Sequence, residues 1–524
     1  MSDSYDDIPY QSIPFTDTHP ENLAMLGRLF GLNTPDPARA RVLELGCASG
    51  GNLLPLAFYL PEGRYLGVEL SARQVQDGQR LIAAVGLDNI RIEQGDILTL
   101  DNTLGDTLGE FDYIIAHGVY SWVPPAVQTR ILDICARHLA PHGIAYISYN
   151  TWPGWHMRWT LRELLLRYTH NANSPGERLA RAQRLLEDFP AALDHSDTLP
   201  TQFLQGEIAR LREAHPSYLY HEYLESINQP QYVREFIASA ERHGLQYVCD
   251  ADLKSMFPSV LGEVAEQWLD QFEDVAEHEQ YLDFLVNRSF RQSLLCRADA
   301  PLSREIELEK LTHYAFYASL RAPDALDLRS AAAQSFLLGK DKPIQVDHPL
   351  TKAALVTLNA RYPDAVAYVE LADTAAEQVH AAGNPQAAAD RNALLTELFM
   401  LFVHQAVGIT PMQRRFHTAL DTRPRAHRLA HVQTMTEIGH LATARHSTIL
   451  LDAFSARLIG YLDGTRDTMQ LTTQLTDDIL EHRLMLPNLQ PVTAETLHAQ
   501  VEANVQRFLK LFARTGILAS PQMR

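Results

Sequence analysis

The sequence predicts an α/β fold: a Rossmann-like domain with a helical insertion, followed by mainly helical, winged-helix-like C-terminal domains. Three observations support this prediction. An apolar run, Val42–Leu45, suits a buried parallel strand and leads through the small residues of Gly46–Asn52 into an apolar helix that begins at Leu53. Four more strand patterns alternate with helical patterns over about 115 residues. From about residue 300 onward, helical periodicity dominates.

The turn after the first strand indicates which cofactors fit. Its pattern runs Glu44-x-Gly46-x-x-x-Gly50, and small residues of this kind let the backbone come close to a ligand. A dinucleotide fingerprint would read G-x-G-x-x-G, but residue 48 is Ala. The spacing therefore disfavours an NAD-dependent enzyme. Any tight strand–helix turn could produce the same pattern, so the turn alone does not identify a ligand.

The strands that follow carry two acidic residues at their carboxyl ends. Glu69 stands about 20 residues after the glycine turn, where a carboxylate can accept hydrogen bonds from both ribose hydroxyls of a nucleoside. Asp96 stands where an adenine amino group could donate to it. A solvated surface position is the alternative for Glu69. The expected strands are Tyr65–Leu70, Ile90–Gln94, Phe111–Ala116 and Ile144–Tyr149.

Residues 156–228 interrupt the alternation, because they show helical patterns without a strand between them and are too long for a loop. We interpret them as a helical insertion that forms a lid or a dimerisation arm. A strand at Leu245–Val248 and a final antiparallel strand at Phe290–Cys296 resume the sheet. The expected domains are a Rossmann-like domain (1–155 and 229–300), the insertion (156–228), a middle regulatory domain (301–415) and a C-terminal helical domain (416–524).

Further elements are expected near both ends of the chain. Asp17 or Thr18 could cap a helix over Glu21–Phe30. Short strands are expected at Phe336–Leu338 and Ile344–Val346. The helical patterns of the C-terminal half are Ala353–Leu358, Asn392–Val407, Ala430–His440, and a last helix with Leu497, Val501, Val505, Phe508 and Phe512 on one face.

The charge, the cysteine spacing and the apolar runs of the chain disfavour several classes of protein. The formal net charge of the 524 residues is −19, which disfavours broad nucleic-acid binding and tolerates cationic substrates such as lysine-bearing protein segments. The four cysteines lie far apart, so neither a disulfide framework nor a zinc knuckle is expected. The acidic N-terminus lacks an apolar signal core, and no apolar run reaches membrane-spanning length. We therefore expect a cytoplasmic protein without membrane insertion.

Taken together, these residues resemble one bacterial group, the class I S-adenosyl-L-methionine (SAM)-dependent methyltransferases that carry a methyltransferase regulatory domain. The group includes the rickettsial lysine methyltransferases that act on an outer-membrane protein. The resemblance is densest over the first 300 or so residues. The matching stretches are Tyr10–Pro20, Arg41–Asn52, His117–Pro124 and Tyr149–Trp155.

The resemblance implies a Rossmann-like SAM-binding domain, an insertion that pairs subunits into a homodimer, and C-terminal domains that shape the access of a protein substrate. The donor-binding residues it implies, together with the two acidic positions above, are Glu44, Gly46, Cys47, Ala48, Gly50, Asn52, Glu69, Leu70, Asp96, Ile97, His117 and Gly118. Residues expected to act in catalysis are Tyr120, Tyr149 and Trp152. The substrate implied is a protein, such as an outer-membrane or envelope protein.

Methyl transfer is an in-line displacement that requires orientation of donor and acceptor rather than a metal or a covalent intermediate. A lysine amine must reach the methyl group uncharged, and desolvation in an aromatic pocket lowers its pKa. Aromatic residues at the expected mouth of the active site could form such a pocket, although packing under the insertion is an equal alternative. These residues are Trp122, Tyr120, Tyr149, Trp152 and Trp155.

The sequence contains two notable histidine features. His117 is expected to bond to the cofactor edge rather than to accept a proton. His427 and His431 have the i, i+4 spacing of metal ligands but lack a third ligand, so we interpret them as solvated surface and predict no metal site. A protein lysine methyltransferase is the first hypothesis. The alternatives are a small-molecule methyltransferase and a non-catalytic SAM-binding regulator.

Overall fold

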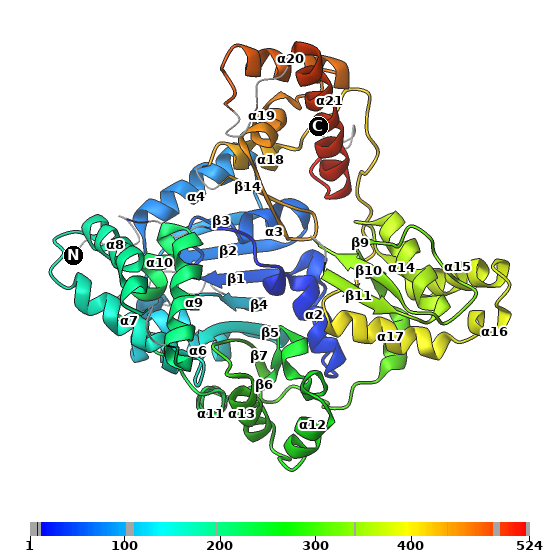
Figure 1. Ribbon diagram of the computed structural model, residues 1–524. Coiled ribbons are helices and arrows are strands. Elements are labelled where there is room, and N and C mark those ends of the chain that lie inside the picture. Colours follow the sequence, from blue (N-terminus) through cyan, green and yellow to red (C-terminus); the bar gives the residue numbers. More distant parts are fainter. Residues whose placement is uncertain are drawn as a thin grey trace.

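The centre of the molecule is a mixed β-sheet (Figure 1). The computed structural model describes residue 8 and residues 12–100, 109–193, 197–339, 342–436, 439–485 and 493–519. Within these residues the central sheet has seven strands in the order β3-β2-β1-β4-β5-β7-β6. The strands are β1 (Arg41–Leu45), β2 (Arg64–Glu69), β3 (Ile90–Gln94), β4 (Phe111–Ala116), β5 (Leu139–Asn150), β6 (Leu245–Asp250) and β7 (Phe290–Arg297).

The first five strands are parallel, and β7 pairs antiparallel with both β5 and β6. This arrangement confirms the predicted α/β sheet and its final antiparallel strand. Both faces of the sheet are covered, since successive residues of β1 enter different cores: Val42 packs into one apolar cluster, Leu43 and Leu45 into the other. The near-continuous apolar run of β1 is explained by this double burial.

Helices α2 (Pro20–Leu29), α3 (Leu53–Tyr59) and α4 (Ala72–Val85) contribute to the first cluster, and α6 (Pro125–His138) and α11 (Val233–Arg242) to the second. The expected cap of α2 is corrected, because the His19 side chain accepts the hydrogen bond from the Glu21 amide. Neither Asp17 nor Thr18 takes that position, since both lie in the short helix that precedes α2. The Ser71 side chain caps α4 by accepting a hydrogen bond from the Gln74 amide.

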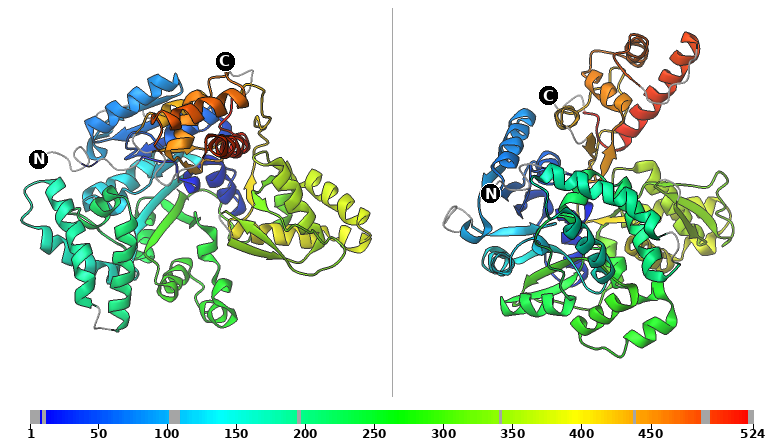
Figure 2. Two further views of the ribbon diagram at one scale, coloured as in Figure 1. Left: turned by 45° about the horizontal axis from the view of Figure 1, so that its top comes forward. Right: turned by 60° about the vertical axis from the view of Figure 1, so that its left-hand side comes forward.

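The helical insertion is confirmed, and Figures 1 and 2 show it as a separate bundle beyond the carboxyl ends of the parallel strands. Its helices pack their apolar sides on one another, with Leu165, Leu186 and Tyr220 among the buried residues of a cluster of their own. The bundle therefore stands beside the sheet without entering its core. Its helices are α7 (Trp155–Thr169), α8 (Pro175–Leu193), α9 (Leu199–Glu213) and α10 (Pro216–Tyr223).

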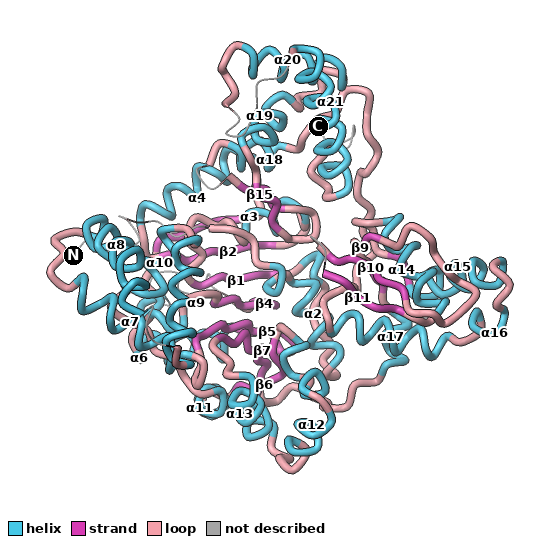
Figure 3. The backbone as a smooth tube through the Cα atoms, in the orientation of Figure 1, coloured by secondary structure: helices cyan, strands magenta, loops and turns pink. Residues whose placement is uncertain are grey.

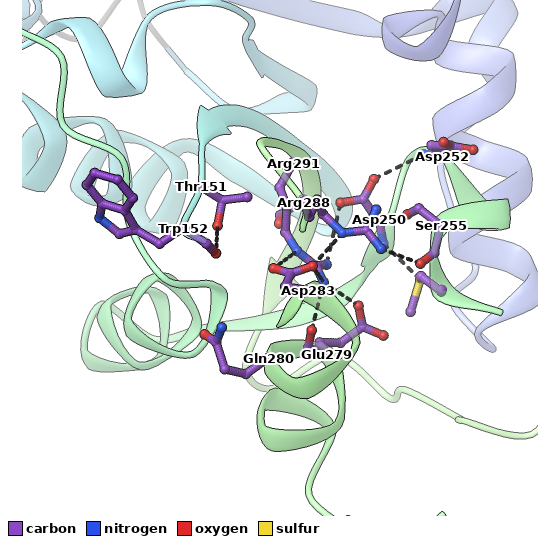
Figure 4. A network of polar contacts seen from close by, with 12 residues as sticks. Thr151, Trp152, Asp250, Asp252, Ser255, Glu279, Gln280, Asp283, Arg288 and Arg291 are labelled. Carbon is purple, nitrogen blue, oxygen red and sulfur yellow. Dashed lines mark hydrogen bonds and ion pairs between the residues drawn. The ribbon is translucent and has the colours of Figure 1, made fainter. Parts of the chain in front are cut away.

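A buried ion network joins the end of the sheet to α13 (Val275–Val286), beyond the shorter helix α12 (Glu263–Leu269) (Figure 4). Arg291 of β7 is fully buried, and its guanidinium lies 2.7 Å from Asp283, 2.8 Å from Glu279 and 3.6 Å from Asp250. Arg288 also pairs with Asp283. A buried cation is tolerated only when carboxylates surround it in this way. The network therefore fixes β6, β7 and α13 as one unit.

The middle domain holds small sheets among its helices, as the strands drawn in magenta outside the central sheet show (Figure 3). The predicted strands at 336–338 and 344–346 are confirmed as parts of β10 and β11. The other strands of this domain are two or three residues long, too short for alternation to reveal them. The elements are β8 (Ala315–Tyr317), β9 (Leu320–Arg321), β10 (Gln334–Leu338), β11 (Lys342–Val346), α14 (Pro349–Arg361), β12 (Val366–Ala367), α15 (Tyr368–Ala381), α16 (Pro385–Ala388), α17 (Arg391–Val403) and β13 (Gly408–Thr410).

The C-terminal domain combines helices with a β-hairpin. The last predicted helix is confirmed, since the five residues of its predicted face are buried in α21. The helix predicted over Ala430–His440 is wrong: α18 ends at Thr434, Gly439 takes a left-handed φ of +60°, and His440 pairs with Leu450 in a hairpin. The elements are α18 (Arg428–Thr434), β14 (His440–Ala442), β15 (Thr448–Leu450), α19 (Ala453–Tyr461), α20 (Thr468–Leu480) and α21 (Ala494–Arg514).

Among the described residues, the helices are too short or too polar to span a lipid bilayer.

Candidate functional site

A cavity of about 420 Å³ opens at the carboxyl ends of β1, β2 and β4, where ligands bind in open α/β sheets. Its volume lies in the range of small-molecule and cofactor sites. The strands supply the loops that line its floor, while the N-terminal segment and α10 cover it. The lining includes Ser12, Ile13, Phe15, Glu44, Gly46, Cys47, Ala48, Asn52, Glu69, Leu70, Asp96, Ile97, His117, Gly118, Trp122, His221 and Glu222.

The glycine turn has a backbone that only particular residues allow. Gly46 and Gly50 take φ values of +72° and +80°, and a Cβ atom on them would lie 2.5 Å from Val119 Cγ2 and 2.6 Å from Ile92 Cδ1. Ala48 takes a φ of +49°, an uncommon conformation for a residue with a side chain. The Ala48 amide donates to Glu69 Oε2 at 2.9 Å, which holds this strained turn against β2.

Glu69 stands between the turn and the next helix. Its Oε2 accepts from Ala48 and its Oε1 accepts from the Ser71 amide at 3.0 Å. Each carboxylate oxygen can accept more than one hydrogen bond, so the same group can also receive ribose hydroxyls in the cavity. Leu70, next to it, is 56% exposed and offers an apolar surface to a flat base. Asp96 borders the cavity at the end of β3 and accepts from the Leu98 amide at 2.9 Å.

Glu44 provides the most informative feature of the cavity floor. It is 4% exposed, and its Oε1 accepts from Asn52 Nδ2 at 3.0 Å, whereas its Oε2 has no hydrogen-bond partner among the described residues. The pKa of Glu44 is raised to about 8, mainly by burial and also by the nearby charge of Glu69, while the Asn52 hydrogen bond lowers it. An orphaned buried carboxylate oxygen in a cavity suits a cationic ligand group.

His117 and Gly118 follow β4. His117 Nδ1 lies 2.9 Å from the Tyr146 hydroxyl, and its ring centroid lies 3.9 Å from that of Phe15. Burial lowers the pKa of His117 to about 4, so its ring is neutral at pH 7. A base of such low pKa is a poor proton acceptor, which agrees with the interpretation of His117 as a contact to the cofactor edge. The Gly118 amide donates to Ser148 Oγ at 2.8 Å.

The structure brings the predicted donor-binding residues together. Glu44, Gly46, Cys47, Ala48, Asn52, Glu69, Leu70, Asp96, Ile97, His117 and Gly118 all line the cavity. Gly50 shapes the turn from behind the lining. Their individual roles in donor binding stay predictions.

The residues predicted to act in catalysis lie elsewhere. Tyr120 and Tyr149 are each 1% exposed and pack on Phe236, with ring centroids 5.4 and 4.2 Å away. The Tyr149 hydroxyl lies 3.1 Å from Ser293 Oγ, and burial raises the pKa of both phenols. Trp152 stacks on His156 at 4.3 Å. None of the three side chains belongs to the cavity lining. The burial of Tyr120 and Tyr149 favours the packing alternative for these two, whereas Trp152 is half-buried and its role stays a prediction.

Residues from distant segments complete the cavity. Phe15 comes from the N-terminal segment, one of the stretches that carry the resemblance. Tyr10 and Gln11 of that stretch lie outside the described residues. His221 and Glu222 come from α10. Nothing in the local sequence singles out these two residues of the insertion, because only the tertiary fold brings them to the strand ends.

The histidine pair in the C-terminal domain needs a correction. His427 is 5% exposed, caps α18, and its Nε2 lies 2.8 Å from the Tyr59 hydroxyl of α3. Burial lowers the pKa of His427 to about 3. The interpretation as solvated surface is therefore wrong for His427, which joins two domains. In the part of the chain that the structure describes, no three His, Cys, Asp or Glu side chains form a metal-binding group.

Three protein-family models match successive parts of the chain. A "Methyltransferase domain" matches residues 43–145, a "Predicted methyltransferase regulatory domain" matches 215–297, and a "PKMT, C-terminal winged helix domain" matches 422–517. The winged-helix expectation is thereby confirmed. The regulatory description falls on α10 to β7 rather than on residues 301–415, for which the sequence predicted a middle regulatory domain.

Whole-chain relatives agree with these models. Protein RP789 of Rickettsia prowazekii is 32% identical over 488 residues, which cover 92% of this chain and 87% of that one. The structure of PKMT2 from Rickettsia typhi in complex with AdoHcy is similar with a TM-score of 0.85 and 28% identity, covering 97% of this chain and 100% of the other.

The chain belongs to this family of SAM-dependent methyltransferases. AdoHcy is SAM without its methyl group, so SAM is the cofactor of the methyltransferase. Bound SAM supplies a methyl group carried on a positively charged sulfur. The cavity fits it: the orphaned oxygen of Glu44 and the glycine turn suit its cationic amino-acid portion, and Glu69, Leu70 and Asp96 suit its adenosine.

Proposed function

We propose that the methyltransferase modifies lysine side chains of a protein substrate. Its C-terminal domain matches the PKMT winged-helix model, and the sequence resembles the rickettsial lysine methyltransferases. The net charge of −19 is compatible with a substrate segment that bears lysines. The observation that carries the proposal is Glu222, a carboxylate that the insertion brings to the donor cavity.

Glu222 has the environment expected of an amine-binding group. The structure gives its carboxylate no hydrogen bond or close ion pair among the described residues, although it lines the cavity. Burial raises the pKa of Glu222 to about 7, an effect that the charges of Arg158, Arg210 and Arg162 oppose. Arg158 and Arg210 are themselves paired with Glu207. Glu222 is therefore a carboxylate with unused capacity to accept hydrogen bonds.

Aromatic side chains line the same cavity as this carboxylate. Trp122 and Phe15 offer rings to an incoming aliphatic side chain, and such rings attract ammonium groups by ~0.5–2 kcal/mol. The carboxylate of Glu222 orients the amine and takes a proton from it. The freed lone pair of the nitrogen then forms the N–C bond while the C–S bond of the donor breaks. The electron pair of the C–S bond stays on sulfur. A group with a pKa near 7 suits that proton transfer at physiological pH.

The resemblance to the rickettsial enzymes suggests the setting of this activity. We propose a cytoplasmic homodimer, paired through the insertion, that methylates an outer-membrane or envelope protein. A small-molecule methyltransferase and a non-catalytic regulator are the competing functions.

The test uses purified enzyme, methyl-labelled SAM and a bacterial envelope-protein extract, with tandem mass spectrometry to locate the label. We expect label on lysine Nζ. Glu222→Gln should lower kcat/KM about 100-fold and leave the Kd for SAM within about twofold. Glu213→Gln, a change at an exposed position of the same insertion, is the matched control. Label on small molecules alone would favour the first competitor, and donor binding without any transfer would favour the second.

A further inference from the structure

The turn between β14 and β15 of the C-terminal domain reaches the donor cavity. In that turn His446 is 2% exposed, and its Nε2 lies 2.8 Å from Asn52 Oδ1, across 394 residues of sequence. Thr16 Oγ1 donates to the backbone carbonyl of His446 at 3.1 Å. Figure 1 shows β14 beside the methyltransferase domain, near α3 and α4. The C-terminal domain thus contacts a residue of the cavity lining.

The hydrogen bonds around Asn52 fix the direction of its amide. The Phe15 amide donates to Asn52 Oδ1 at 3.0 Å, and a backbone N–H can only donate, so this side of the amide is the acceptor. Burial, together with the charges of His19 and Arg414, lowers the pKa of His446 far below its usual range. The neutral His446 ring therefore donates from Nε2. The Thr18 hydroxyl also lies 3.1 Å from Asn52 Oδ1, beside the Phe15 amide and the His446 ring. With its oxygen held by these groups, Asn52 directs Nδ2 at Glu44 Oε1, 3.0 Å away.

Contacts of Arg445 anchor the turn between β14 and β15. The neighbouring Arg445 is 7% exposed: its Nη1 lies 3.1 Å from Glu21 Oε2, its Nη2 donates to the Pro363 carbonyl at 2.7 Å, and it lies 3.8 Å from the ring centroid of Tyr317. These partners belong to α2 and the middle domain. Since the anchor does not involve the cavity lining, the imidazole of His446 is held in place independently of the donor.

We infer that His446 is a positioning residue for donor binding, which fixes Asn52 so that Glu44 presents its free oxygen to the cationic portion of SAM. The C-terminal domain thereby completes the donor site from behind, without lining the cavity itself. Donor affinity consequently depends on the docking of this domain, and by linkage the bound donor favours the docked state.

Paired variants separate the hydrogen bond from packing. His446→Phe keeps a ring but removes the donor, whereas His446→Gln places an N–H donor at a similar reach. Calorimetric titration with SAM and with AdoHcy should show Kd about tenfold higher for His446→Phe and within about threefold of wild type for His446→Gln. His482→Ala is the control, because His482 has the same left-handed backbone in the same domain but is exposed.

A double variant tests the path through Asn52. His446→Phe should add less than about twofold to the Kd of Asn52→Ala, because linked residues are not additive. Three results would overturn the inference. They are a further tenfold rise of the Kd in the double variant, a wild-type Kd in His446→Phe, and an equal rise of the Kd in His446→Gln and His446→Phe. If His446→Phe lowers the yield of folded protein, Thr16→Val, which frees the His446 carbonyl, should raise the Kd about threefold; unchanged affinity would count against the inference.

Discussion

Glu44 makes donor binding pH-dependent in a direction that the structure fixes. Its carboxyl has a pKa raised from 4.5 to about 8, mainly by burial, so the protein without donor holds this proton at pH 7. A cationic donor favours the ionised form and displaces the proton. Apparent affinity for SAM should therefore rise as pH increases and level off above about pH 8.

The size of this pH effect on the Kd for SAM follows from the ionised fraction of Glu44. If the ionised form alone binds, the Kd at pH 6.5 should be roughly 15-fold higher than at pH 8.0. The free energy of unfolding changes with pH in the opposite direction, because the folded chain binds the Glu44 proton more tightly than the unfolded chain does. The contribution of Glu44 to stability is therefore present below the unfolded pKa and is lost as pH rises from about 4.5 to about 8.

Calorimetric titration between pH 6.5 and 8.5 measures the effect. The amino group of SAM titrates in the same range, so the informative quantity is the difference between wild type and Glu44→Gln, whose amide does not titrate. Glu110→Gln, an exposed substitution, should follow wild type. Equal pH slopes for wild type and Glu44→Gln would refute the assignment of Glu44 to the cationic portion of the donor.

Other substitutions test the cavity wall and the packing. A Cβ atom on Gly51 would lie 2.0 Å from the carbonyl oxygen of Ser12, which lines the cavity. Gly51→Ala should therefore weaken SAM binding about tenfold in calorimetry, whereas Gly176→Ala, with open space around it, should not. Equal affinities of the two variants for SAM would contradict this prediction. Asp283→Ala should lower the free energy of unfolding by about 3–5 kcal/mol in urea, because it leaves a buried guanidinium short of a partner; a loss below about 1 kcal/mol would argue against the network. Tyr149→Phe should cost about 1 kcal/mol of stability and spare turnover, whereas a large loss of kcat would return Tyr149 to catalysis.

The fold was predictable where its signals are local. The strand and glycine turn around Gly46 and Gly50 dictate their own conformation, since positive φ values and close backbone approach require small residues. Glu69 follows from the same unit at a fixed spacing. The sheet, its antiparallel last strand and the insertion follow from periodicity. Each of these features follows from a pattern in its own stretch of sequence.

The rest depends on contacts between distant segments. Tyr149 ends a predicted strand, but whether its ring enters the cavity or packs on Phe236 depends on a helix that the sequence places more than 80 residues later. Glu222 and His446 carry no motif, and each reaches the site through a separate domain. His427 looks like surface in an alternating charged stretch, yet it packs against Tyr59. Such roles arise from domain packing, which local patterns do not contain.

The most direct test of the account is a crystal structure of the protein with AdoHcy. We expect AdoHcy in the cavity at the ends of β1, β2 and β4, with its amino group at Glu44, its ribose at Glu69 and its sulfur facing the side of the cavity that holds Glu222. AdoHcy bound elsewhere, or bound with its sulfur turned away from Glu222, would contradict it.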